Sequence, residues 1–260
     1  VVGKWHLGHF EPEYLPLQRG FDLQYGHYNG ALDYFTHDRD GGHDWHRNGQ
    51  PVYEEGYTTD LKGKEAARII EAHDSDTPLF LYVPFNAPHT PLQATKEHLE
   101  RNAHIEDKNR RTYAAMVTSM DDAIGVILES ADQHLSRENT LILFFSDNGG
   151  LVRLGSNREL RGEKDTLYEG GVRVPAIATW EGTIQAGDVV DEALHVVDLY
   201  PTLLGLAGSR PTQALPLDGK DVWPSILKGK SVQREFMLLN LTPFHGSIRM
   251  GDWKLIHNGH

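Results

Sequence analysis

The chain has 260 residues, of which 39% are hydrophobic and 24% charged, which is ordinary for a globular protein able to bury a sizeable core. Its formal net charge of -12 excludes a general nucleic-acid binder, because such proteins need a broad basic surface. The absence of cysteine excludes disulfides, thiolate metal sites and a cysteine nucleophile within these residues. No stretch has the length of an apolar transmembrane helix, so we expect no membrane span.

The first third of the chain predicts loops followed by a helix and a strand. Val1-Val2-Gly3-Lys4 starts without methionine, as though a strand had been cut part way along, so we expect a fragment or a processed product. Residues 10–58 are dense in aromatics, histidine, glycine and aspartate, and predict long surface loops that shape a pocket. Residues 59–73 have a modest helical apolar face. Residues 78–85 predict a strand that ends in a loop presenting His89.

The next part of the chain alternates helices with strands. Apolar residues recur at three- and four-residue spacing over residues 109–134, which predicts an amphipathic helix packed on a sheet. The apolar run 140–145 predicts a fully buried strand, and residues 172–180 predict another. A further helix should start at Asp198, with Pro201 near its first turn. This alternation predicts an α/β fold with a mostly parallel sheet flanked by helices.

The predicted secondary structure changes near the C-terminal end of the chain, where strands no longer alternate with helices. Residues 236–241 and 247–256 look like antiparallel strands, the second of them bent at Gly251-Asp252. We therefore expect residues 1–234 to belong to the α/β domain and residues 235–260 to begin a small antiparallel C-terminal subdomain.

A possible cation site follows the predicted strand 140–145. Asp147 and Asn148 come directly after this strand, at the position where open α/β sheets keep their ligand sites. Gly149 and Gly150 let the backbone turn sharply behind them. Carboxylate and amide oxygens suit a hard divalent cation. A plain Asp-Asn-Gly turn explains the same residues, since such side chains favour turns for local reasons.

Four cationic or titratable side chains stand in distinctive local settings. Lys4 and His6 are two residues apart, so in an extended segment both would point to the same side. His89 stands at the mouth of a strand, and Lys164 precedes the Gly170-Gly171 pair. Together with the cation site, these residues predict an electropositive pocket suited to a tetrahedral oxyanion. For each of them, a solvated or hydrogen-bonded surface group is the alternative interpretation.

These segments together resemble the type I sulfatases. Gly3-Lys4-Trp5-His6-Leu7-Gly8 is similar to the family's lysine-histidine signature. Residues 87–93, 146–150 and 160–173 match further family segments in the same order. Within the family, residues 33–37, 110–116 and 198–203 are most similar to arylsulfatases of the B type. The resemblance spans nearly the whole chain and implies an alkaline-phosphatase-like fold.

The resemblance also implies a role for each candidate residue. Asp147 and Asn148 would be calcium ligands, and Lys4 would bridge the cation and a formylglycine nucleophile. His6 would assist the hydrated formylglycine as a base. His89 and Lys164 would hold the sulfate oxygens and help the leaving oxygen depart. The expected function is therefore hydrolysis of sulfate esters, on a sulfated carbohydrate or an aryl sulfate.

The sequence departs from the family pattern at the nucleophile. The motif Cys or Ser followed by x-Pro-x-Arg is absent from these 260 residues, as is the early aspartate pair that completes the calcium site. We expect both to lie upstream of Val1, and residues 1–260 alone to be inactive. By analogy with the family, we expect a periplasmic, secreted or lysosomal protein.

Two alternative functions remain open from the sequence. One is a phosphatase or phosphodiesterase of the alkaline phosphatase superfamily, whose oxyanion pocket would look alike in outline. The other is a non-catalytic module that binds sulfated glycans. For the glycan itself, the residues expected to stack on and hydrogen-bond to sugar rings are Tyr34, His37, His43, Asp44, Trp45 and His46.

Overall fold

A computed structural model describes residues 1–74 and 76–257 of the chain. These residues form two compact units, and each is described by itself. Unit 1 comprises Val1–Ser136 and Arg153–Gly155, and unit 2 comprises Arg137–Val152 and the chain from Ser156 onward. Among the residues described, no helix is long and apolar enough to cross a membrane.

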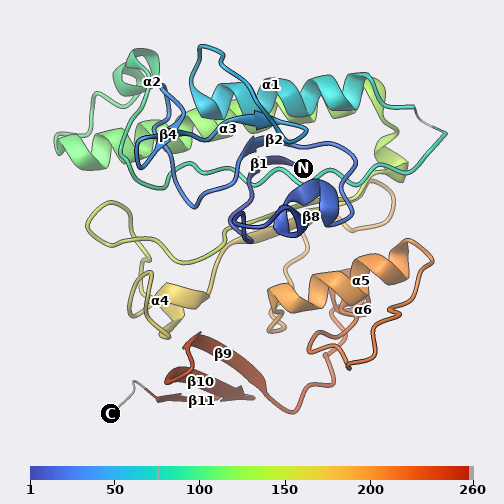
Figure 1. The fold of residues 1–260 in the computed structure, drawn as a ribbon. Coiled ribbons are helices and arrows are strands. Elements are labelled where there is room, and N and C mark those ends of the chain that lie inside the picture. The colour runs from blue at the N-terminus through green and yellow to red at the C-terminus, as the bar shows by residue number, and fades with distance from the viewer. Residues whose placement is uncertain (75, 258–260) are drawn as a thin grey trace. The chain divides into compact units, whose positions relative to one another are not determined.

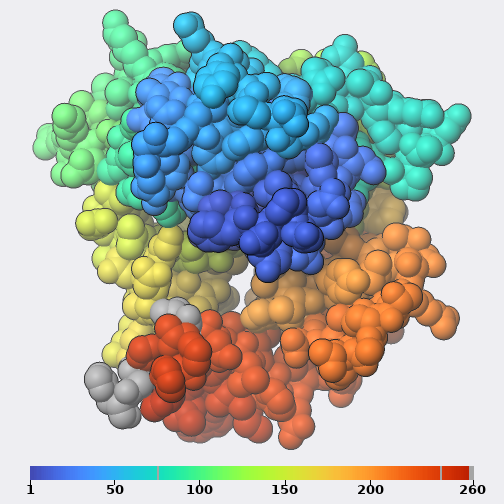
Figure 2. Space-filling view, in the orientation of Figure 1, coloured from blue at the N-terminus to red at the C-terminus, as the bar shows by residue number. Residues whose placement is uncertain are grey.

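Unit 1 contains short strands and the helices α1, α2 and α3, of which α2 was not predicted from the sequence (Figure 1). A four-stranded sheet has the order β1-β2-β5-β6, and a separate hairpin joins β3 to β4. The 3-10 turns η1 and η2 lie in the exposed N-terminal segment, coloured dark blue in Figure 2. The element bounds are β1 Val2–Lys4, η1 Pro12–Tyr14, η2 Pro16–Gln18, β2 Tyr25–His27, β3 Asp38–Arg39, β4 Gly42–His43, β5 His46–Arg47, β6 Gln50–Pro51, α1 Thr58–Glu71, α2 Lys96–Arg101 and α3 Lys108–His134.

Three backbone segments run side by side at the start of unit 1. β1 pairs in parallel with β2, in the register that places Gly3 opposite Gly26. On its other side, Val2 N donates to Tyr82 O at 2.9 Å and Lys4 N to Pro84 O at 2.8 Å, so the predicted strand 78–85 lies along β1 in the same direction. A Cβ atom on Gly3 would lie 2.1 Å from Pro84 O, and one on Gly26 would lie 2.3 Å from Gly3 O. Glycine therefore allows this close approach of backbones.

The helices α1 and α3 confirm their sequence predictions and lie against each other (Figure 1). They approach closely at Gly63, where an added Cβ would be 2.9 Å from the Cβ of Ala123. The face of α1 that carries Ala66 and Ile69 is buried in a core with Val2. The apolar spacing thus gave the correct element for both segments and the correct face for α1. The helix α3, which was expected to pack on a sheet, packs mainly on α1.

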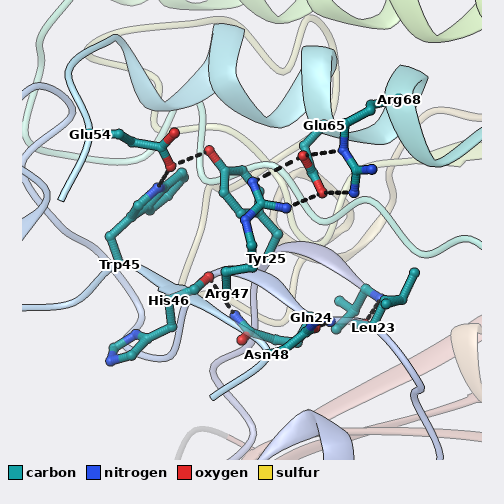
Figure 3. A network of polar contacts seen from close by, with 11 residues as sticks. Leu23, Gln24, Tyr25, Trp45, His46, Arg47, Asn48, Glu54, Glu65 and Arg68 are labelled. Carbon is teal, nitrogen blue, oxygen red and sulfur yellow. Dashed lines mark hydrogen bonds and ion pairs between the residues drawn. The ribbon is translucent and has the colours of Figure 1, made fainter. Parts of the chain in front are cut away.

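Side-chain bonds join the sheet of unit 1 to α1 (Figure 3). Glu65 on α1 accepts from both Arg47 of β5 and Arg68 one turn further along the helix. Glu54 accepts from Tyr25 Oη at 2.6 Å and from Trp45 Nε1 at 2.7 Å. The loop-rich region 10–58 is thereby held to a helix, and it contains fully buried side chains. The expectation that these residues are all surface loops is wrong, because their aromatic side chains build the core.

Unit 2 contains two small sheets and short helices. β7 pairs antiparallel with β8, and β9, β10 and β11 form a three-stranded antiparallel sheet with β10 in the middle. The element bounds are η3 Arg137–Asn139, β7 Ile142–Phe145, α4 Glu169–Val172, β8 Ala176–Thr179, η4 Val196–Asp198, α5 Leu199–Leu206, α6 Trp223–Lys228, β9 Met237–Thr242, β10 His245–Met250 and β11 Trp253–His257.

Three sequence predictions for unit 2 need correction. The strand expected to be fully buried is β7, but Phe144 and Phe145 are 38% and 40% exposed, because in the described residues β7 pairs only with β8. The strand predicted at 172–180 begins only at Ala176, after the α4 turn. The bend expected at Gly251-Asp252 is a complete turn between two strands, and Gly251 has a positive φ of 53°.

The predicted α/β class and the small antiparallel C-terminal sheet are confirmed. The parallel pairing expected from the alternation occurs around β1, whereas the other ladders between the described strands are antiparallel. The domain boundary at residues 234 and 235 stays a prediction.

Candidate functional site

Lys4 and His6 stand at the end of β1, but not in the way that an extended strand would place them. β1 ends at Lys4, and His6 has a left-handed φ of 52°. The expectation that both side chains point to one side held only for an extended segment, and the backbone at His6 is not extended. Hydrogen bonds from Trp5 N to His27 O at 2.9 Å and from His6 N to Tyr28 O at 3.0 Å hold this turn.

The imidazole of His6 lies directly against Gly30. A Cβ atom on Gly30 would be 2.6 Å from His6 Nε2, so only glycine leaves room for the ring in this position. Asp44 fixes the adjacent backbone, since its carboxylate accepts from Tyr28 N and Asn29 N at 2.9 Å each. The exposed His6 ring thus extends from a short turn, and the bonds to Asp44 hold the neighbouring backbone of Tyr28 and Asn29 in place.

His89 is held by its own loop. Its backbone N donates to Asn86 O at 2.8 Å, and its ring Nδ1 lies 2.8 Å from Thr90 O. Because a carbonyl oxygen only accepts, Nδ1 carries the hydrogen in the neutral ring and Nε2 carries the lone pair. Tyr34 Oη contacts the carbonyl oxygens of both Asn86 and His89, at 3.0 and 2.8 Å.

His6 and His89 line one cleft of about 660 Å³ within unit 1. The β3–β4 hairpin region contributes Asp38, Arg39 and Asp40 to the same cleft, and Arg39 Nε lies 3.2 Å from Asp40 Oδ2. The structure therefore brings together two histidines from distant motifs and a set of carboxylates. Such a lining can bind sugar hydroxyl groups and place a titratable imidazole beside them. The sequence carries a weak signal for the hairpin, the turn residues Asp40, Gly41 and Gly42.

Most of the residues that the sequence predicted to contact sugar do not line this cleft. Tyr34 and Trp45 are fully buried, and His37 is 1% exposed. Asp44 is buried and bound to the backbone of the neighbouring segment, while His43 and His46 are half-buried. This prediction is therefore wrong for the two aromatic rings, because their apolar surface serves the core and not the cleft.

Asp147 and Asn148 follow β7 in unit 2, as the sequence predicted. Asp147 is exposed, and its carboxylate makes no hydrogen bond or ion pair with the described residues. Asn148 Nδ2 donates to Gly149 O at 3.1 Å, so the amide group is oriented by its nitrogen while Oδ1 can accept or ligate. One carboxylate and one amide oxygen fit a hard divalent cation. In the parts of the chain that the structure describes, no cluster of three His, Asp or Glu side chains offers another such site.

Lys164 is close in the fold to this turn. Its backbone N donates to Gly150 O at 3.3 Å, and Asn157 bridges the two segments by donating from Nδ2 to Gly150 O and to Gly162 O. A Cβ on Gly149 would lie 1.8 Å from Gly170 O, which shows how tightly the turn packs against α4. Unit 2 thus brings Lys164, Asp147 and Asn148 into neighbouring segments, and unit 1 brings Lys4, His6 and His89 into one region.

Sequence reasoning missed Lys62. This residue on α1 is fully buried, although lysine is almost never found without exposure. Burial, followed by the charge of Lys4, holds the pKa of Lys62 well below its usual value, and Asp44 opposes this shift. The sequence feature that could have indicated its burial is its spacing of four residues from Ala66 and seven from Ile69. This spacing places Lys62 on the buried face of the helix.

Comparisons with known proteins give a consistent result. Residues 1–209 match the family model described as Sulfatase. The chain is 37% identical to arylsulfatase J of Mus musculus over 97% of this chain and 44% of that protein. It is 34% identical to N-acetylgalactosamine-6-sulfatase of Mus musculus over 90% of this chain and 47% of that protein. The chain therefore spans about half the length of these curated relatives.

One solved structure is similar over nearly the whole chain. The structure of Ps i-CgsB in complex with k-i-k-neocarrahexaose has a TM-score of 0.90 and 34% sequence identity. The match covers 98% of this chain and 61% of that chain. The backbone arrangement described above is thus one that is known from experiment.

Proposed function

Since this chain belongs to the sulfatase family, we propose that the full-length protein hydrolyses sulfate esters of a carbohydrate. The observation that carries this proposal is the single cleft lined by His6 and His89, which come from two family-like motifs far apart in the sequence. The same likeness supports the alkaline-phosphatase-like fold. No observation favours a phosphatase or a non-catalytic glycan-binding module.

In this proposal, the side chains of unit 1 act at the ester. His6 serves as a base, since its ring is exposed and rests on the anchored turn beside Gly30. In its protonated form, His89 donates from Nε2 to a sulfate oxygen, because Nδ1 is engaged by Thr90 O. Lys4, at the end of β1, supplies positive charge that stabilises the developing negative charge. Each of these roles follows from the family resemblance.

We assign the charge-binding roles of unit 2 in the same way. Lys164 would bind a sulfate oxygen as a fixed ammonium donor. Asp147 and Asn148 would hold a divalent cation, which we propose to be calcium, because both ligands are oxygens. Calcium takes six to eight oxygen ligands, so these two side chains supply only part of the shell. When bound, the cation would supply Lewis-acid stabilisation of negative charge.

The nucleophile is proposed to lie outside these 260 residues. The sequence contains no cysteine and no Ser-x-Pro-x-Arg segment, so it offers no source for the formylglycine that the family resemblance implies. The residues described here would then bind and orient the ester and move its protons. They would act on a group that another segment of the full-length protein provides.

We propose a sulfated sugar as the substrate. The carboxylates of Asp33, Asp38 and Asp40 line the cleft and can accept hydrogen bonds from sugar hydroxyls, and Arg39 can donate to a ring or ester oxygen. The similar structure of Ps i-CgsB contains k-i-k-neocarrahexaose, which supports an oligosaccharide. By analogy with the family, we propose a periplasmic, secreted or lysosomal location.

The test is hydrolysis of p-nitrophenyl sulfate and p-nitrophenyl phosphate by the full-length protein with calcium present. We expect turnover of the sulfate ester and a loss of at least about tenfold in the His89→Ala variant. Turnover of the phosphate ester alone would show that the protein is a phosphatase. The absence of turnover of either ester, together with binding of a sulfated oligosaccharide, would favour the non-catalytic module.

A further inference from the structure

Lys62 is a buried amine that is not paired with a carboxylate among the described residues. Its side chain has 0% exposure, and within the described residues no carboxylate lies at ion-pair distance from it. Burying an amine in this way costs free energy unless the group is hydrogen-bonded. Lys64, two residues further along the same helix, is exposed. A buried lysine at this position therefore calls for a function that an apolar side chain could not perform.

The amine of Lys62 contacts one residue of the His89 loop. Lys62 Nζ donates to Asn86 Oδ1, and it lies 5.6 Å from the ring centroid of Trp45. Asn86 is itself only 3% exposed. The backbone carbonyl of Asn86 accepts from His89 N at 2.8 Å. A continuous set of hydrogen bonds thus leads from Lys62 on α1, through Asn86, to the backbone of His89.

We propose that Lys62 is a positioning residue for His89, which it fixes by holding Asn86 at the base of the loop. This inference rests on the proposed function, in which His89 contacts the sulfate group. Tyr34 Oη is also bonded to this loop, through the backbone carbonyl oxygens of Asn86 and His89. Neither of these bonds involves the side chain of Asn86. Lys62 is thus the side chain that fixes the orientation of the Asn86 amide.

The hydrogen bond to Asn86 does not depend on the charge of the amine. Burial and the nearby charge of Lys4 lower the pKa of Lys62, while Asp44 raises it. With or without its extra proton, the amine has a hydrogen to donate to Asn86 Oδ1. The Asn86 side chain uses only its oxygen, since its Nδ2 has no hydrogen-bond partner within the described residues. Replacement of Asn86 by aspartate would therefore keep an acceptor for the Lys62 amine, exchange the unpaired donor for a carboxylate oxygen, and give Lys62 a countercharge.

The test is a double-mutant cycle in the full-length protein, with p-nitrophenyl sulfate as substrate. We expect Lys62→Met to lower kcat/KM by about 10- to 100-fold, since small displacements of a contacting group have effects of this size. In the His89→Ala background, the same substitution should change kcat/KM by less than about twofold, because its effect passes through His89. Lys64→Met is the matched control and should leave activity within about twofold of wild type.

Two outcomes would overturn the positioning role. One is an unchanged kcat/KM in Lys62→Met while His89→Ala is impaired. The other is an equal loss in the presence and absence of His89, which would indicate a general structural effect. If His89→Ala has no effect, the proposed role of His89 fails first, and the positioning role fails with it.

A second pair of variants keeps the inference testable if Lys62→Met does not fold. Asn86→Asp retains the acceptor for Lys62, and we expect its kcat/KM to stay within about fivefold of wild type. Asn86→Ala removes the acceptor, and we expect a loss similar to that of Lys62→Met. Equal activity of the two Asn86 variants would refute the proposal.

Discussion

The buried lysine on α1 gives a sharp prediction about stability and pH. In the folded protein, burial and the charge of Lys4 hold the pKa of Lys62 well below its ordinary value of 10.5, with Asp44 opposing the shift. In the unfolded chain, the amine returns to that ordinary value. Between the two pKa values, the unfolded state binds one more proton than the folded state. The free energy of unfolding must therefore rise with pH through this window.

The magnitude follows from the difference of one proton. Each pH unit inside the window adds about 1.4 kcal/mol to the free energy of unfolding. Lys62→Met has no such proton, so its free energy of unfolding should lack this contribution. From pH 7 to pH 9, the difference between wild type and Lys62→Met should grow by about 2.7 kcal/mol in favour of wild type, where the window covers that range.

Urea unfolding of the full-length protein at pH 7, 8 and 9 measures this difference. Tryptophan fluorescence follows the unfolding, and one of the five tryptophans of the chain is the fully buried Trp45, whose ring centroid lies 5.6 Å from Lys62 Nζ. Lys64→Met should give a curve parallel to wild type, because that lysine is exposed. A difference between wild type and Lys62→Met that does not change with pH would refute the reasoning. It would mean that Lys62 keeps its proton in the folded state.

Three further substitutions test the site and the fold. Asp147→Ala should abolish the calcium-dependent rise in melting temperature of the full-length protein, because a cation that binds only the native state stabilises it. Lys164→Ala should lower kcat/KM for p-nitrophenyl sulfate by about 10²- to 10³-fold with an unchanged circular dichroism spectrum, because it removes an oxyanion donor. Glu65→Gln should lower the free energy of unfolding by about 2 kcal/mol at pH 7, because it weakens the bonds from Arg47 and Arg68. Burial raises the pKa of the Glu65 carboxyl, but the bonds from the two arginines lower it more, so wild type should lose this advantage as the pH falls below 4.5.

Each of these substitutions has a matched control on an exposed side chain of the same unit. The controls are Asp191→Ala, Lys220→Ala and Glu71→Gln, and all three should behave like wild type. A wild-type protein whose melting temperature ignores calcium would rule out the cation site. Unaltered kinetics in Lys164→Ala would remove its assigned role. Acid unfolding that is identical in Glu65→Gln and wild type would show that the two arginines do not stabilise the carboxylate.

Local patterns in the sequence predicted the long elements of the fold well. The spacing of apolar residues placed α1 and α3 to within a residue or two at each end, because these helices bury one continuous face. The same reasoning failed for the burial of β7. An apolar run shows which side chains favour burial, whereas coverage depends on which strands lie beside it, and in the described residues that is β8 alone.

The structure brings His6 and His89 to one cleft, while the roles predicted for the site residues stay predictions. The motifs identified His6 and His89, yet the left-handed φ of His6 could not be predicted from a strand-like segment. The role of Lys62 could not be predicted from the sequence, because its hydrogen-bond partner, Asn86, is distant in the chain. In addition, a lysine is rarely buried, so burial was not expected. The sequence predicted that Trp45 faces a sugar, but the ring is fully buried. The sequence could not distinguish these positions, because an aromatic ring suits a core and a glycan equally well.

The glycine pair of β1 and β2 has a consequence for how such a chain can diversify. Any side chain at Gly3 or Gly26 would collide with backbone oxygen atoms, and these atoms cannot rotate away. In a library of all single substitutions, both positions should therefore accept only glycine. Arg39 at the cleft is exposed on a hairpin and has no such restriction. The hairpin beside the cleft can thus vary in sequence, while the backbone spacing beneath Lys4 stays the same.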